Sequence, residues 1–207
     1  MRILLLRHAT TDMVDTHLCG DEPGIRLNGL GRKQAAALAR RIPPVDALLS
    51  SPIDRALETA RIVGALKRLR PKIVEEFREF DFGRWAGKRF TDLARDPQWR
   101  RFEENTPSVR APGGESMRDV RSRSVSALEA MVELNNRNKT IVVVSHSAII
   151  RALLTHAADA PLRNYWRFTS EPASISELQY DGARGFYIRR VNDCAHLEHL
   201  AEETLQL

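Results

Sequence analysis

An arginine and a histidine stand together where a short apolar run ends. The run is Ile3 to Leu6, and Arg7 and His8 follow it directly. Such a run predicts a buried strand, and open α/β folds bind ligands at the carboxyl edge of their strands. A permanent cation and a titratable imidazole at that edge are suited to chemistry on an anion. The plain alternative is that the pair only marks where a strand reaches solvent.

Three further segments carry polar groups that could complete such a site. Arg55 lies near the start of an expected helix, and His146 follows a β-branched run. A carboxylate region at 78–83 holds Glu79 and Asp81, which are equal candidates for an acid on these grounds. Arginines offer planar pairs of donors to phosphate oxygens, and a neutral imidazole can attack phosphorus. The set predicts a pocket for a dianion. Arg55 considered alone is more typical of an arginine on the surface of a helix.

Composition narrows the classes of protein. The chain has 207 residues, 43% of them hydrophobic, and a formal charge of +5. This length suits one buried core, so we expect a single domain over residues 1–207. Acidic residues are interleaved with the basic ones, and no stripe of aromatic and basic residues is present. We therefore expect a small anionic partner rather than nucleic acid.

The sequence carries no pattern typical of a metal site or a membrane span. Cys19 and Cys194 form neither a disulfide framework nor a Cys-x-x-Cys site. No segment approaches the ~20 apolar residues that a membrane span needs. We expect a cytoplasmic protein without membrane contact. The histidines expected to have no site role are His17, His156, His196 and His199, the last two lying on an exposed helix turn that lacks partners for zinc.

Strand-like runs alternate with helical patterns, which is typical of βαβ units around a mostly parallel sheet. The expected strands are 2–7, 47–50, 73–75 and 140–145, with a closing antiparallel hairpin of 174–180 and 186–191. The expected helices are 31–42, one starting at 51, 120–134 ended by Asn135, Asn136 and Asn138, and 149–158.

Two of these helices have capping signals at their starts. Ser51 can cap the second helix, with Pro52 at the first helical position and Asp54 as a capping carboxylate. Ser116 and Asp119 have the spacing of a capping box before the third. Both signals predict where the chain turns away from the sheet edge.

Residues 80–114 interrupt this regular alternation. The segment holds two tryptophans, three prolines and many charges. A segment of this kind is typical of an insertion or cap over the sheet edge, where loops carry specificity. We expect it to select the leaving group of a substrate, although nothing in it names one.

Five motifs follow one another in a fixed order. They are Leu-Leu-Arg-His-Ala-Thr-Thr at 5–11, Ser-Ser-Pro-Ile-Asp-Arg-Ala-Leu-Glu-Thr-Ala at 50–60, Glu-Phe-Asp-Phe-Gly-Arg-Trp-Ala-Gly at 79–87, Pro-Gly-Gly-Glu-Ser at 112–116 and Val-Ser-His-Ser at 144–147. The ordered set resembles the phosphoglycerate mutase-like branch of the histidine phosphatase superfamily over roughly residues 2–190, and within it the small cofactor-independent phosphatases, α-ribazole phosphatase-like members included. The resemblance implies an α/β three-layer sandwich, a mostly parallel sheet flanked by helices, with a small cap insertion at 80–114.

The same resemblance implies a role for each matching residue. His8 would take the phosphoryl group, and Glu79 would protonate the leaving oxygen and then activate water. A carboxyl can do this only with a raised pKa. The phosphate-binding residues would be Arg7, Arg55, His146, Thr11 and Ser147. Such catalysis rests on positioning and charge stabilisation, so neither a metal nor a cofactor is expected.

The chain departs from the family pattern close to the expected nucleophile. Ala9 stands where glycine is usual, and Thr10 where glutamate is common. Val14 replaces an asparagine that often contacts the phosphoryl group, and Cys19 replaces a frequent glutamine. We expect a phosphate contact to be missing and the site to differ most from its relatives at 9–11.

Together these observations predict a phosphomonoesterase that acts on a small soluble phosphorylated metabolite through a phosphohistidine. The short chain without an extended tail favours hydrolysis over mutase transfer. Two alternatives stay open, a phosphoglycerate mutase-type transfer and a module that binds a phosphorylated ligand without turnover. The substrate, the pathway and the oligomeric state, a dimer included, cannot be read from the sequence.

Overall fold

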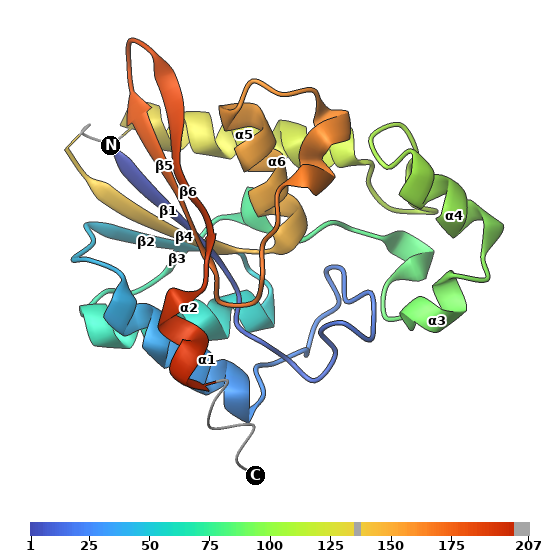
Figure 1. Ribbon diagram of the computed structural model, residues 1–207, viewed down its shortest axis with the longest axis horizontal. Helices are drawn as coiled ribbons and strands as arrows, with labels where there is room; N and C mark the ends of the chain where they lie inside the picture. Colours follow the sequence, from blue (N-terminus) through green and yellow to red (C-terminus); the bar gives the residue numbers. More distant parts are fainter. Residues whose placement is uncertain (135–137, 201–207) are drawn as a thin grey trace.

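A six-stranded sheet forms the centre of the computed structural model, which describes residues 1–134 and 138–200 (Figure 1). Its order in this part of the chain is β3-β2-β4-β1-β5-β6. The strands are β1 (Arg2–Arg7), β2 (Ala47–Ser50), β3 (Lys72–Ile73), β4 (Thr140–Ser145), β5 (Ile175–Asp181) and β6 (Gly185–Asp193). Strands β1 to β4 are parallel, whereas β5 pairs antiparallel with β1 and β6. The expected α/β class and the closing hairpin are confirmed.

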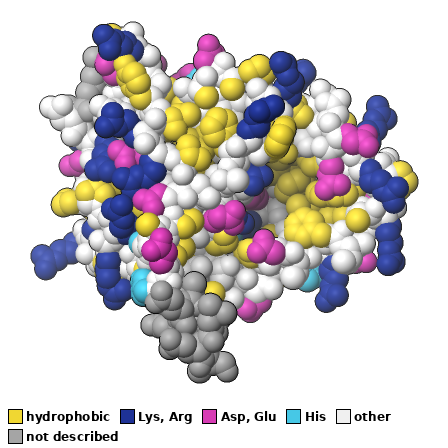
Figure 2. Space-filling view, viewed as in Figure 1, with side chains coloured by type: hydrophobic (Ala, Val, Ile, Leu, Met, Phe, Trp, Pro, Cys, Tyr) yellow, Lys and Arg dark blue, Asp and Glu magenta, His cyan; other side chains and the backbone are white. Residues whose placement is uncertain are grey.

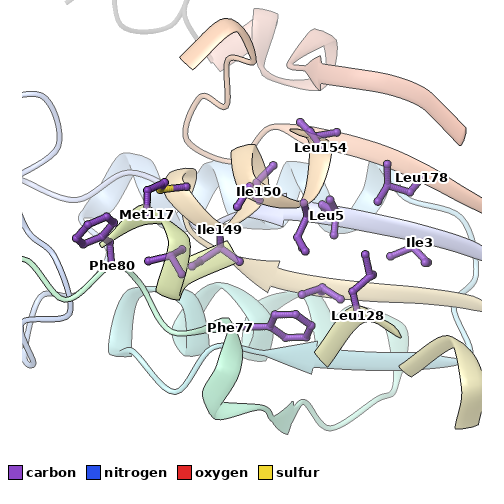
Figure 3. Packing of buried hydrophobic residues seen from close by; sticks show 14 of the residues in the cluster. Ile3, Leu5, Phe77, Phe80, Met117, Leu128, Ile149, Ile150, Leu154 and Leu178 are labelled. Atoms are coloured by element: carbon purple, nitrogen blue, oxygen red, sulfur yellow. The ribbon is translucent and has the colours of Figure 1, made fainter. Parts of the chain in front are cut away.

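Helices cover both faces of the sheet. Helices α1 (Gly29–Arg41) and α2 (Asp54–Lys67) lie on one face, and α5 (Met117–Leu134) and α6 (Ser147–Ala157) on the other (Figure 1). Leu4 and Leu6 pack with α1 and α2, whereas Ile3 and Leu5 belong to the cluster shown in Figure 3 with α5 and α6. A strand buried on both faces needs apolar side chains at every position, which explains the continuous run in β1.

The register of the sheet brings the two expected histidines to one edge. Strands β1 and β4 are neighbours, and Arg7 pairs with Ser145 where both strands end. His8 and His146 are the next residues along each strand. Strand β2 lies on the other side of β4, and Arg55 follows it in the first turn of α2. These residues therefore meet at the carboxyl edge, where α/β sheets bind ligands.

Short helices rather than strands follow β3. They are η1 (Glu75–Phe77), η2 (Gly83–Trp85), α3 (Phe90–Leu93) and α4 (Pro97–Glu104). Helices α3 and α4 stand to one side of the sheet in Figure 1. Stacked and edge-on aromatic rings hold this segment together, namely Phe80, Phe82, Trp85, Trp99 and Phe102. Trp85 Nε1 also donates to Asp96 Oδ2 at 3.0 Å.

Two helix starts differ from the expected ones. Helix α1 begins at Gly29 rather than at 31, because Asn28 caps it and accepts from the Gly31 N–H at 2.8 Å. Helix α2 begins at Asp54, three residues after the expected start, with Ile53 at the cap position. The Ser51 hydroxyl accepts from the Ile53 N–H at 3.2 Å, before the helix begins, and also lies 2.7 Å from a ring nitrogen of His146.

Other bounds shift by a few residues. Strand β3 ends at Ile73 rather than 75, because η1 begins at Glu75, and α6 begins at Ser147 rather than 149. The hairpin strands reach Asp181 and Asp193. The Ser116–Asp119 capping box is confirmed, since the Ser116 N–H donates to Asp119 Oδ2 at 2.7 Å and the Asp119 N–H to Ser116 Oγ at 3.4 Å. Asn135 and Asn136, expected to end α5, lie outside the described residues.

Candidate active site

His8 is held in one ring orientation by two hydrogen bonds. Its Nδ1 lies 2.8 Å from the carbonyl oxygen of Ala9, and Arg55 Nε lies 3.2 Å from its Nε2. A carbonyl oxygen only accepts, so Nδ1 carries the proton and Nε2 accepts from Arg55. Burial, reinforced by the charges of Arg55 and Arg7, holds the pKa of His8 well below its usual value. The imidazole is therefore neutral near pH 7, with its lone pair on Nε2.

A histidine buried in its neutral form makes stability depend on pH. The unfolded chain binds the proton below about pH 6.5 and the folded chain does not, so stability is lost as the pH falls below that value. Between pH 7 and pH 5, the unfolding free energy of the wild type should fall through this proton linkage. In His8→Gln, which lacks the imidazole, the fall should be smaller by about 2 kcal/mol. Urea denaturation at both pH values measures this, with His199→Gln as a surface control. Equal losses in His8→Gln and wild type would contradict the buried neutral state.

Two guanidinium groups beside His8 keep unused donors. Arg55 is only 1% exposed, and its Nη2 donates to the carbonyl of Gly20. Arg7 Nη1 donates to the carbonyl of Ser170 at 2.6 Å. Arg7 Nε and Arg55 Nη1 are buried and have no hydrogen-bond partner within the described residues. Because buried donors without acceptors are costly, this arrangement is suited to receive the oxygens of an anion.

His146 approaches His8 from the end of β4. The two ring centres are 5.2 Å apart. Ser51 Oγ lies 2.7 Å from His146 Nε2 and accepts from the Ile53 N–H at 3.2 Å. Because Ser51 is fully buried, its hydroxyl proton is satisfied only by donation to Nε2, which leaves the ring proton on Nδ1. That Nδ1 lies 3.9 Å from Glu79 Oε2 and has no hydrogen-bond partner in the described part of the chain.

Glu79 brings a carboxyl group to the same place. Burial raises the pKa of Glu79, and the positive charges of Arg55 and Arg7 oppose this rise without cancelling it. The direction is the one that a general acid requires. Asp81, the competing candidate, accepts from the Gly83 N–H at 2.8 Å and is not among the residues that line the cavity. The geometry favours Glu79 for any contact with a bound ligand.

An ion pair behind the cavity holds the Glu79 segment. Arg123 on α5 binds Glu115 through two hydrogen bonds, at 2.7 Å from Nε and 2.9 Å from Nη2. The same guanidinium donates to the carbonyls of Glu76, Arg78 and Glu79. One side chain therefore fixes the backbone on which the Glu79 carboxyl depends. No sequence motif indicated Arg123, because the carbonyls that it binds lie more than 40 residues away along the chain.

We expect Arg123→Met to lower the unfolding free energy by about 3 kcal/mol. The variant removes both short hydrogen bonds from the buried Glu115 carboxylate, which keeps only the Asp81 N–H and Arg78 at 4.0 Å. The double variant Arg123→Met, Glu115→Gln should recover part of that loss, since no uncompensated charge remains. Arg118→Met, at an exposed position of the same helix, is the matched control. Urea denaturation measures the unfolding free energy of all three variants. If Arg123→Met were no less stable than Arg118→Met, the stabilising role of Arg123 would be wrong.

A cavity of about 260 Å³ opens in front of these groups. Among the expected site residues, those on its wall are Arg7, His8, Arg55, Glu79 and Ser147. Aromatic and other apolar side chains line the remainder, including Phe82, Phe90, Phe102 and Met117. Figure 2 shows hydrophobic side chains gathered on the face next to α3 and α4. The site thus combines a charged end with an apolar wall.

Two expected phosphate-binding residues do not line the cavity. His146 is buried behind it and reaches the others through its ring nitrogen Nδ1. Thr11 is buried, and its hydroxyl accepts from the Met13 N–H at 3.3 Å, so the structure places it in a local turn. Two of the unusual residues, Val14 and Cys19, do line the cavity. The departures from the family pattern therefore do reach the site.

The four remaining histidines differ in position. His17 lines the cavity, contrary to the expectation that it lies outside the site. His156 lies 3.6 Å from Glu129, and His199 is exposed. The expected helix turn is present, but His196 in η4 (Ala195–Leu197) is half-buried rather than exposed, with Nε2 3.1 Å from the carbonyl of Ala173. In the described ranges, no group of three His, Cys, Asp or Glu side chains could hold a metal ion.

Sequence reasoning missed two further cavity residues. Arg151 lies on α6 four positions after Ser147, and Tyr165 lies in η3 (Leu162–Arg167), which packs against α6. Helical periodicity places residues four apart on one face, so a site residue at Ser147 already pointed to Arg151. Within the described ranges, no helix is long and apolar enough to span a membrane.

Comparison with known proteins identifies the family. The chain belongs to the histidine phosphatase superfamily (branch 1), whose family model matches residues 3–194. It is 34% identical over 203 residues to a bifunctional protein of Mycobacterium tuberculosis, covering 95% of this chain and 55% of that protein. The chain thus spans about half the length of that relative.

A second relative is similar in length. Phosphoserine phosphatase 1 of Hydrogenobacter thermophilus is 31% identical over 206 residues, covering 95% of this chain and 94% of that protein. Among solved structures, the α-ribazole phosphatase of Shigella flexneri superimposes with a TM-score of 0.84 over 93% of this chain and 96% of that chain, at 24% identity. This structural likeness confirms the phosphoglycerate mutase-like fold.

Proposed function

We propose that this chain hydrolyses phosphomonoesters of small soluble metabolites through a phosphohistidine on His8. The observation that carries the proposal is the neutral Nε2 of His8 among buried N–H donors that lack acceptors. These donors are Arg7 Nε, Arg55 Nη1 and His146 Nδ1. A phosphoryl group in transfer spreads charge over its peripheral oxygens, which such donors stabilise without a metal.

The first step forms a bond between His8 Nε2 and phosphorus. Arg55, which now donates to Nε2, turns its donor to a phosphoryl oxygen and releases the lone pair. As the P–N bond forms, the P–O bond to the leaving group breaks, and protonated Glu79 gives its proton to the leaving oxygen. The raised pKa of Glu79 keeps enough of the acid form for this transfer.

The second step returns the site to its starting state. The Glu79 carboxylate takes a proton from water, and the water oxygen attacks phosphorus. The P–N bond breaks, inorganic phosphate leaves, and His8 is neutral again. Splitting the reaction in this way replaces one difficult displacement by two easier ones.

Family membership and the phosphatase names of relatives support this proposal. We further propose Ser147, on the cavity wall at the amino end of α6, as a phosphate contact, and residues 80–114 as the cap. The proposal includes one domain over residues 1–207, a cytoplasmic location, and no metal or cofactor. The phosphate contact of Thr11 stays a prediction, because Thr11 is not among the residues that line the cavity.

A hydrolysis screen tests the function directly. Wild type and His8→Ala are incubated in EDTA with sugar phosphates, phosphoglycerates, nucleotides, phosphoserine and α-ribazole phosphate, and released phosphate is measured. We expect release by wild type alone. Release of 2-phosphoglycerate from 3-phosphoglycerate, instead of free phosphate, would establish the mutase alternative. Binding without turnover of any compound would establish the binding module.

A further inference from the structure

A third guanidinium group lies on the cavity wall, beyond the two that the proposed phosphoryl site uses. Arg151 lines the cavity together with Ser147 and Ala148 of the same helix. Its Nε is buried and has no hydrogen-bond partner within the described residues. The pKa of Arg7 is lowered by burial first and also by the charge of Arg151, so the two cations lie near each other. The cavity therefore carries more positive charge than Arg7 and Arg55 alone supply.

This arginine has no structural partner of the kind that Arg123 has. Arg123 is bound by Glu115 and three backbone carbonyls. In the described part of the chain, Arg151 has neither a carboxylate within ion-pair distance nor a side-chain hydrogen bond. The Arg151 side chain is half-buried, and its buried Nε donor without an acceptor costs free energy in the free protein. That cost is recovered when an anion enters the cavity.

One phosphoryl group does not account for all three arginines. Arg55 contacts the nucleophile and Arg7 precedes it in the chain, so these two surround the reacting phosphorus. Arg151 lies one helical turn further along α6, on the wall shared with Tyr165 and the aromatic side chains. Because the proposed function assigns Arg7 and Arg55 to the phosphoryl group, Arg151 is left to meet another part of the substrate.

We propose that Arg151 binds a second anionic group, a carboxylate or a second phosphate, on the leaving group of the substrate. The proposal rests on the proposed function and narrows its substrate class to phosphomonoesters whose alcohol carries a negative charge. Arginine suits this role because its planar donors pair with both oxygens of a carboxylate or with two phosphate oxygens. The cavity of about 260 Å³ has room for a small alcohol beside the phosphoryl group.

Matched substrate pairs test the proposal. 3-Phosphoglycerate and glycerol 3-phosphate differ in one carboxylate, as do phosphoserine and phosphoethanolamine. Glucose 1,6-bisphosphate and glucose 6-phosphate differ in one phosphate. We expect wild type to favour the more charged member of at least one pair by ~10- to 100-fold in kcat/KM, the range of a charge-assisted hydrogen bond. The pair that shows this preference identifies the anion as carboxylate or phosphate.

Substitution of Arg151 assigns the preference to that residue. In Arg151→Gln the ratio should fall to about threefold or less, through loss on the charged substrate only, and Arg151→Lys should keep part of it. Arg163→Gln, an exposed change of the same charge, should keep the wild-type ratio. An unchanged ratio in Arg151→Gln, or no preference in wild type, overturns the proposal.

A binding measurement separates this inference from the proposed function. Calorimetry gives the Kd of 3-phosphoglycerate and glycerol 3-phosphate for His8→Ala and for the double variant His8→Ala, Arg151→Gln, in which the covalent step cannot consume the ligand. If no phosphomonoester is hydrolysed by wild type but the difference in Kd disappears in the double variant, the proposed function fails and the anion site stands. If hydrolysis proceeds and neither Kd nor kcat/KM depends on Arg151, the anion site fails and the proposed function stands.

Discussion

Replacing His8 with alanine is expected to lower kcat/KM for phosphomonoester hydrolysis by at least ~10³-fold, because the covalent step loses its nucleophile. Arg7, Arg55 and His146 remain in the variant, so it should still bind inorganic phosphate. Initial-rate kinetics measure the first effect, and calorimetry with phosphate measures the second. Loss of turnover with retained binding would show that His8 acts in the chemistry rather than in holding the anion.

A control variant guards against a general effect of losing a histidine. His156 lies on α6 beside Glu129 and is not part of the cavity wall. We expect His156→Ala to keep kcat/KM within about twofold of wild type, as is usual for substitutions away from a site. If His8→Ala kept more than about a tenth of the wild-type rate, the attack by Nε2 would be wrong.

Replacing Glu79 with glutamine is expected to lower kcat/KM for alkyl phosphates by ~10²- to 10⁴-fold, the usual contribution of a general acid. The loss in kcat/KM should be much smaller for p-nitrophenyl phosphate, whose leaving oxygen departs without a proton. Rates with both substrates measure the difference. An equal loss for the two substrates would mean that Glu79 does not protonate the leaving group.

Asp81→Asn tests the competing carboxylate. Asp81 binds the Gly83 N–H and does not line the cavity, so this variant should keep activity within a few-fold of wild type. A loss in Asp81→Asn as large as that in Glu79→Gln would reopen the choice that the sequence left even.

The acid role also fixes the pH profile. Glu79 has a raised pKa and must be protonated to act, so kcat/KM falls as the pH rises above that pKa. His8 stays neutral down to well below its usual pKa, so its protonation does not change kcat/KM near pH 7. We expect Glu79→Gln to lose the alkaline limb that the wild type shows. Retention of that limb in the variant would assign it to another group.

Local sequence pattern was sufficient for the parts of the fold that rest on buried runs. The bounds of β1, β2 and β4 match the expected ones, because each run is apolar and ends at a polar residue. The helix starts were less predictable. Ser51 has the pattern of a cap, yet its hydroxyl lies against His146, a residue 95 positions away. The same hydroxyl still accepts from the Ile53 N–H, so Ser51 serves both the turn before the helix and the site.

The candidate site divides in the same way. Arg7, His8 and Ser147 are placed by strand ends and the helix that follows, so their positions could be inferred from the alternation of elements. Arg123 could not be assigned, because its hydrogen bonds to Glu115 and three backbone carbonyls form only in the folded chain. Helical spacing from Ser147 indicated the position of Arg151, but only the folded chain shows its unpartnered donor. No sequence pattern indicates that a buried donor will lack an acceptor.

Trapping the phosphorylated enzyme tests the central claim most directly. Wild type is mixed with a substrate identified in the screen, quenched under alkaline conditions that preserve phosphohistidine, digested and examined by mass spectrometry. We predict one phosphate on His8 that forms during turnover and disappears when substrate is exhausted. Phosphate on the Ser147 hydroxyl, or turnover without any phosphorylated enzyme, would contradict the mechanism.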